Sequence, residues 1–154
     1  MTMLRRAIRV LPAGQLDAEA SAGSVTLAFD DRYRRRIQLT DDAGDPFLLD
    51  LARAVVLNDG DGLELDDGSM LIVRAADEDL AEVRCATPEM LARIAWHLGN
   101  RHLSVQVTAD AIRLRWDHVI VDMLRGLGAE VVALRAPFTP ESGAYATGGH
   151  DHHH

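Results

Sequence analysis

Two of the seven histidines lie in one short stretch, Trp96-His97-Leu98-Gly99-Asn100-Arg101-His102, and imidazole is a common ligand of divalent metal ions. His97 lies at the border of an apolar stripe, where packing is the simpler role. His102 follows the stripe and can face another molecule. Because the helix dipole also favours a histidine at a helix C-terminus, spacing alone leaves open whether His102 binds a metal or is an ordinary surface residue.

Four more histidines, His150, His152, His153 and His154, end the chain. Four imidazoles on a flexible segment can surround almost any borderline divalent ion. The alternative interpretation is an affinity tag, although Asp151 interrupts the run and tags are usually longer and unbroken. The tail is therefore a candidate metal-gathering segment.

The remaining histidine, His118, lies in the first turn of a second helix, on the side away from its apolar stripe. It can be interpreted either as an exposed polar residue or as a metal ligand. No His-x-x-x-His pair shares a helix face and Cys85 is the only cysteine, so we expect no closed zinc site within one chain. A small hydrolase using His97 or His102 as general base is disfavoured, because no serine, cysteine or paired carboxylate stands beside them. We therefore expect no enzymatic activity.

The helix that ends near His102 has clear sequence signals. Thr87 is a plausible N-cap, Pro88 suits the first helical position, and Glu89 places negative charge at the positive end of the dipole. We expect Gly99 and Asn100 to end the helix in a left-handed turn. The apolar stripe of this helix comprises Met90, Leu91, Ile94, Ala95 and Leu98.

A second helix and four strands complete the second half of the chain. Strands are predicted at 80–85, 104–107, 112–116 and 131–134. Asp117 caps the second helix and Gly128 ends it, and the predicted stripe is Val119, Ile120, Met123, Leu124 and Leu127. The order βαββαβ is that of a ferredoxin-like domain over 77–137. RNA-recognition modules share this order, but they need exposed aromatic residues on the central strands, and Val105, Val107, Ile112 and Leu114 supply none.

Residues 1–76 read as short strands separated by turns, such as Asp66-Asp67-Gly68, and predict an all-β domain that docks partners. Its most partner-like feature is the run Arg34-Arg35-Arg36, for which solvated strand residues are the alternative interpretation. Beyond Pro137 the chain contains too few apolar residues to stay ordered, so we predict a flexible tail over 138–154. The fold class is therefore α+β, with an all-β domain, a ferredoxin-like domain and a disordered histidine-rich tail.

Composition limits the partners and the compartment. The formal charge of −8 argues against nucleic acid or an anionic membrane as a general partner. No stretch approaches the ~20 apolar residues that span a bilayer, and too few apolar residues follow Arg5 and Arg6 for a signal peptide. We expect a soluble cytoplasmic protein.

Four motifs occur in order over most of the second half: Gly99-Asn100-Arg101-His102 preceded by His97, Asp117-His118-Val119-Ile120 with Met123-Leu124, Gly126-Leu127-Gly128-Ala129, and the terminal His150-Asp151-His152-His153-His154. Together these motifs resemble the UreE family, the nickel-carrying urease accessory proteins.

The resemblance implies the same two-domain fold and a metallochaperone that delivers Ni²⁺ for assembly of the urease active site. It implies a homodimer in which paired His102 residues hold the metal, with Zn²⁺ or Cu²⁺ also able to bind, and tail histidines that assist. His97, at the border of the apolar stripe, is a secondary candidate that suits packing. His118 is secondary as well, because Trp116 stands where family members with a richer site have a further histidine. Expected partners are the urease apoprotein and the other accessory proteins, including the GTPase.

Trp96 is predicted to be exposed, and an exposed tryptophan next to the motif suggests a surface that a partner covers.

Overall fold

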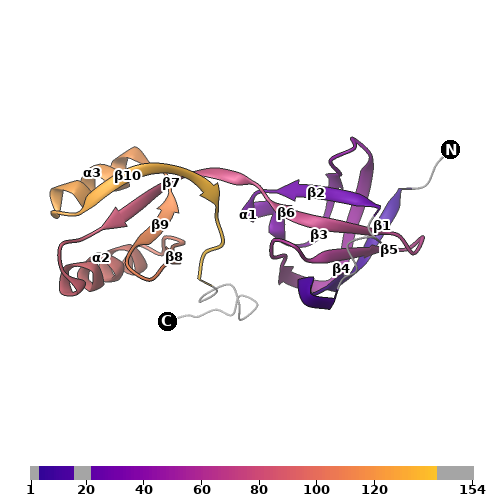
Figure 1. The fold of residues 1–154 in the computed structure, drawn as a ribbon, viewed down its shortest axis with the longest axis horizontal. Helices are drawn as coiled ribbons and strands as arrows, with labels where there is room; N and C mark the ends of the chain where they lie inside the picture. Colours follow the sequence, from indigo (N-terminus) through magenta and orange to yellow (C-terminus); the bar gives the residue numbers. More distant parts are fainter. Residues whose placement is uncertain (1–3, 16–21, 142–154) are drawn as a thin grey trace. The chain divides into compact units, whose positions relative to one another are not determined.

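The computed structural model describes residues 4–15 and 22–141. The chain divides into two compact units, Met1–Ala76 and Asp77–His154. Figure 1 shows the first as a sheet-rich body and the second as a sheet with two helices. The described part of the chain has no helix with the length and apolarity needed to cross a membrane.

The first unit is built on one six-stranded sheet in the order β2-β6-β5-β1-β4-β3. Strands β1 and β4 pair in parallel, as do β2 and β6, and the remaining pairs are antiparallel. Its core is aliphatic apart from Phe47. The elements are β1 (Arg5–Leu11), η1 (Ala13–Gln15), β2 (Gly23–Leu27), α1 (Phe29–Arg32), β3 (Tyr33–Thr40), β4 (Pro46–Val56), β5 (Gly62–Leu65) and β6 (Met70–Ala75).

The second unit has the order βαββαβ, and its antiparallel sheet runs β10-β7-β9-β8. The two helices cover one face, because their buried residues share a core with alternate side chains of the strands, among them Ala81, Val83 and Leu114. The predicted α+β class with a ferredoxin-like second domain is confirmed. The elements are β7 (Asp77–Arg84), α2 (Pro88–Asn100), β8 (Gln106–Val107), β9 (Ile112–Arg115), α3 (His118–Gly126) and β10 (Glu130–Pro137).

Both helix starts follow the predicted capping chemistry. The Thr87 hydroxyl accepts from the Met90 N–H at 3.1 Å. The Asp117 carboxylate accepts from the Val119 N–H at 2.9 Å and the Ile120 N–H at 3.3 Å. Each cap satisfies amides that have no partner within the helix, so each fixes the residue at which its helix begins.

The apolar stripe of α3 differs from the prediction. Val121 is buried and Val119 is 61% exposed, so the core-facing stripe contains Val121 in place of Val119. Three consecutive apolar residues, 119–121, fit more than one stripe of a 3.6-residue period, and packing of Val121 and Leu124 against the sheet core selects the observed one. Val119 is therefore an apolar side chain on the outer surface of the described chain.

The sequence predicts a flexible tail from residue 138, but the structure shows that residues 138–141 pack against the second unit. Phe138 is fully buried, and the Arg115 guanidinium lies 5.2 Å from its ring centroid. The Thr139 N–H donates to the Gln106 side-chain oxygen at 3.1 Å, and the Glu141 N–H donates to the Val105 carbonyl at 2.7 Å. This segment carries the chain from β10, at one edge of the sheet, to β8, at the other. A single buried aromatic residue without periodic neighbours gives no sequence signal for such a crossing.

Candidate metal centre

His102 occupies the turn that ends α2, and its backbone is in the left-handed region with φ of 59°. The His102 N–H donates to the Gly99 carbonyl at 2.9 Å, and the Leu103 N–H donates to the Leu98 carbonyl at 3.1 Å. This pair of bonds is the Schellman motif, in which the left-handed position is usually glycine. The helix therefore continues through Gly99 and Asn100, which were expected to form the left-handed turn, and His102 takes that position.

The turn is held in place from the core side. Leu98 is fully buried, and Leu103 packs against the same core, so the apolar contact typical of this motif is present. A left-handed backbone costs a residue with a side chain about 1 kcal/mol or more relative to glycine. Histidine thus occupies a position that glycine would take at lower backbone cost, which directs attention to its exposed imidazole.

His102 also lines a pocket of about 220 Å³ between the end of α2 and the start of α3. The opposite wall includes Trp116 and Asp117, which follow β9 in the chain. One Asp117 oxygen is engaged in capping α3, so this carboxylate is fixed at the pocket. No sequence pattern predicts that Trp116 or Asp117 lies beside His102, because the fold of the sheet brings these residues together.

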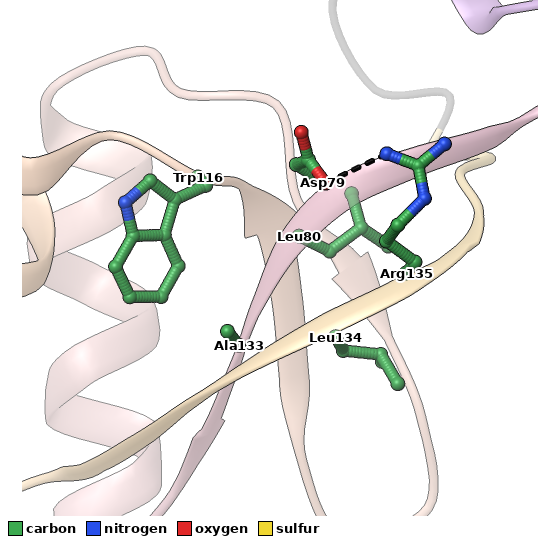
Figure 2. A pocket seen from close by; sticks show the side chains of 6 residues that line it. All are labelled: Asp79, Leu80, Trp116, Ala133, Leu134 and Arg135. Atoms are coloured by element: carbon green, nitrogen blue, oxygen red, sulfur yellow. Dashed lines mark hydrogen bonds and ion pairs between the residues drawn. The ribbon is translucent and has the colours of Figure 1, made fainter.

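Trp116 borders a second pocket, of about 310 Å³, on its other side. Figure 2 shows its indole near Ala133 of β10, with the Arg135 guanidinium donating to Asp79 at 2.7 Å. The lining residues include no histidine or cysteine, and their single carboxylate is paired with Arg135. We therefore assign no metal role to this second pocket.

Within the described residues, neither His97 nor His118 joins His102. His97 is partly buried, and its ring meets that of Trp96 edge to face at a centroid distance of 5.1 Å. His118 is exposed at the first position of α3 and does not line the His102 pocket. His150, His152, His153 and His154 lie outside the described residues. Among the residues described, no group of three or more histidine, cysteine, aspartate or glutamate side chains is placed to hold a metal ion.

One large apolar side chain is exposed on the helix that leads to the site. Trp96 on α2 is 64% exposed, as predicted, although tryptophan is highly buried on average in folded proteins. Cys85, by contrast, is partly buried against the core, and burial raises the pKa of its thiol. Cys85 does not line the His102 pocket, so it supplies no second donor there.

Comparison with known proteins assigns both units. Residues 7–76 match the model of the UreE urease accessory protein N-terminal domain, and residues 78–154 match that of the C-terminal domain. The chain is 52% identical to the urease accessory protein UreE of Bradyrhizobium sp. strain BTAi1, over 96% of this chain and 73% of that protein. It is 47% identical to the protein of the same name from Beijerinckia indica, over 96% of this chain and 85% of the relative. With Cereibacter sphaeroides UreE the identity is 45%, over 99% of this chain and 82% of the relative. The chain therefore belongs to the UreE family of urease accessory proteins.

Proposed function

We propose that this chain is a nickel metallochaperone, which binds Ni²⁺ as cargo and delivers it for assembly of the urease active site. Membership of the family places the chain in urease maturation, and the observation that supports metal carriage is the exposed His102 imidazole on a strained, well-anchored turn. A carrier must hold its ion selectively and still release it, so an open site with few protein ligands suits the role. Imidazole binds nickel, zinc and copper, so the preference for nickel is taken from the family.

One imidazole per chain is too few for tight binding, and the described part of one chain does not gather more ligands around His102. A twofold axis places two copies of the same residue opposite each other. We infer a homodimer in which the two His102 side chains bind one ion. The exposed Trp96 on the same helix supports a covered surface here, because a buried aromatic side chain is a frequent anchor of interfaces.

A role for the tail at this site is supported by the segment that follows β10, which brings Glu141 beside the chain that follows α2. Glu141 contacts Val105, which is only three residues after His102, and its carboxylate also accepts from the Val107 N–H at 3.2 Å. The residues from 141 to 150 can extend about 30 Å at most. We propose that the tail histidines bind ions and pass them to His102, or complete its coordination. The urease apoprotein and the accessory GTPase are the proposed recipients and partners, in the cytoplasm.

The dimer is tested by sedimentation of the metal-free protein at micromolar concentration. We expect a dimer, and we expect Trp96→Glu to shift it to monomer, because a buried charge without a partner is strongly unfavourable at an interface. Val132→Glu, at an exposed valine on β10, is the matched control and should remain dimeric. A parent protein that stays monomeric with and without nickel would exclude the shared site.

A further inference from the structure

A group of arginines lies on the first unit where β3 begins. Arg34, Arg35 and Arg36 are consecutive, and the register of β3 against β4 shifts between Arg34↔Val55 and Arg36↔Asp50. Residues 51–54 of β4 therefore form a bulge opposite Arg35, and the bulge contributes Arg53. Together with Arg6 of β1, these residues are here called the arginine patch: Arg6, Arg34, Arg35, Arg36 and Arg53.

Three members of the arginine patch keep their charge unneutralised. The Arg34 side chain donates to the main-chain carbonyl of Asp30 at 3.1 Å, and Arg35 donates to that of Leu51 at 3.4 Å. A carbonyl fixes a guanidinium in position but does not cancel its charge. Within residues 4–15 and 22–141, neither these two arginines nor Arg53 form an ion pair, and all three are exposed.

The other two members share one carboxylate. Asp50 lies between Arg6, at 2.8 Å, and Arg36, at 3.4 Å. The hydrogen bond from Arg6, with further help from the nearby charges of Arg36 and Arg35, lowers the pKa of Asp50. Asp50 thus stays ionised and orients two guanidiniums, but it neutralises only one of them. The patch has an excess of positive charge on a chain whose formal charge is −8.

Elsewhere in the described chain, exposed arginines are either paired with a carboxylate or lie singly, as Arg74 on β6, Arg101 after α2 and Arg125 on α3 do. Arg9 contacts Glu64 at 2.6 Å, Arg93 contacts Glu89 at 2.8 Å, and Arg135 contacts Asp79 at 2.7 Å. The arrangement at β3 is therefore not simply a consequence of an arginine-rich composition.

We propose that the arginine patch binds an acidic segment of a partner protein. Guanidinium groups bind carboxylates through paired, charge-assisted hydrogen bonds. Arg34 and Arg36 lie on the same face of β3, about 7 Å apart, which matches carboxylates at alternate positions of an extended acidic segment. A duplex or an anionic bilayer would also be repelled by the rest of a chain whose formal charge is −8, whereas a short segment is screened from charges beyond about 10 Å at 0.1 M salt. This inference does not depend on the nickel site.

The test is binding of a short fluorescent polyglutamate peptide, followed by anisotropy at low salt. The variant R34Q/R36Q/R53Q should bind about tenfold more weakly than the parent, because it loses the two guanidiniums that face the segment from β3 and the unpaired charge of Arg53. The matched control R9Q/R93Q/R135Q removes the same number of charges from paired arginines and should lose less than about twofold.

Equal losses in the two triple variants would overturn the proposal, because net charge alone would then explain the binding. Tighter binding of duplex DNA or of phosphatidylserine vesicles than of polyglutamate would also overturn it. Thermal unfolding of each variant checks that the fold is intact. Nickel titration of the patch variant should match the parent, which separates a failure here from a failure of the metal proposal.

Discussion

His102→Gly is expected to abolish tight nickel binding while leaving the fold as stable as the parent, or more stable by about 1 kcal/mol. The imidazole is the proposed ligand, so its removal eliminates the site. Glycine adopts the left-handed backbone at φ of 59° without the steric cost that a side chain adds. Part of this gain is offset by the greater freedom of glycine in the unfolded chain. Calorimetric titration with nickel and urea unfolding measure the two effects.

His102→Ala is the matched control, because alanine removes the imidazole but keeps the backbone strain. It should lose nickel equally and be less stable than His102→Gly. Tight nickel binding in both variants would show that His102 is not the ligand. A glycine variant less stable than the alanine variant would show that the strained turn is absent in solution.

Phe138→Ala should destabilise the C-terminal unit by roughly 3–5 kcal/mol, the usual cost of removing a fully buried aromatic side chain. The variant would also lose the contact between this ring and the Arg115 guanidinium. Val132→Ala, at a valine that is 44% exposed on β10, is the comparison and should cost less than about 1 kcal/mol. Urea unfolding measures both. A cost below about 1 kcal/mol for Phe138→Ala would mean that the segment after β10 is not docked in solution.

The features that the sequence predicted best are those with local causes. The starts of α2 and α3 depend on Thr87 and Asp117, whose side chains cap amides two or three residues away. The βαββαβ order follows from the change between periods of 2 and 3.6 residues along the chain. Such signals are contained within a few consecutive residues.

The end of α2 was misplaced because it depends on a tertiary contact. Gly99 and Asn100 are better suited than His102 to a left-handed backbone by intrinsic preference. Burial of Leu98, with Leu103 packed against the same core, extends the helix and places His102 in the turn. Intrinsic preference is worth about 1 kcal/mol, which the burial of one leucine exceeds. The resemblance suggested His102 as a ligand, which remains a proposal, and only the structure shows its left-handed backbone.

The pocket beside His102 could not be predicted either. Trp116 and Asp117 approach it because β9 lies beside β8 in the sheet, and strand order is a property of the whole domain. The burial of Phe138 could not be predicted for the same reason, because it also depends on the arrangement of the whole domain. A sequence pattern identifies neighbours along one helix or strand, whereas these contacts join elements that are distant in the chain.

The most direct test of the nickel proposal is the number of nickel ions held per pair of chains in protein that ends at residue 147, measured by native mass spectrometry. This protein lacks every tail histidine and keeps His102, His97 and His118. The account predicts one tightly held nickel ion per dimer, and additional ions only when the tail is present. One nickel ion bound by each separate monomer, or no tight binding without the tail, would contradict it.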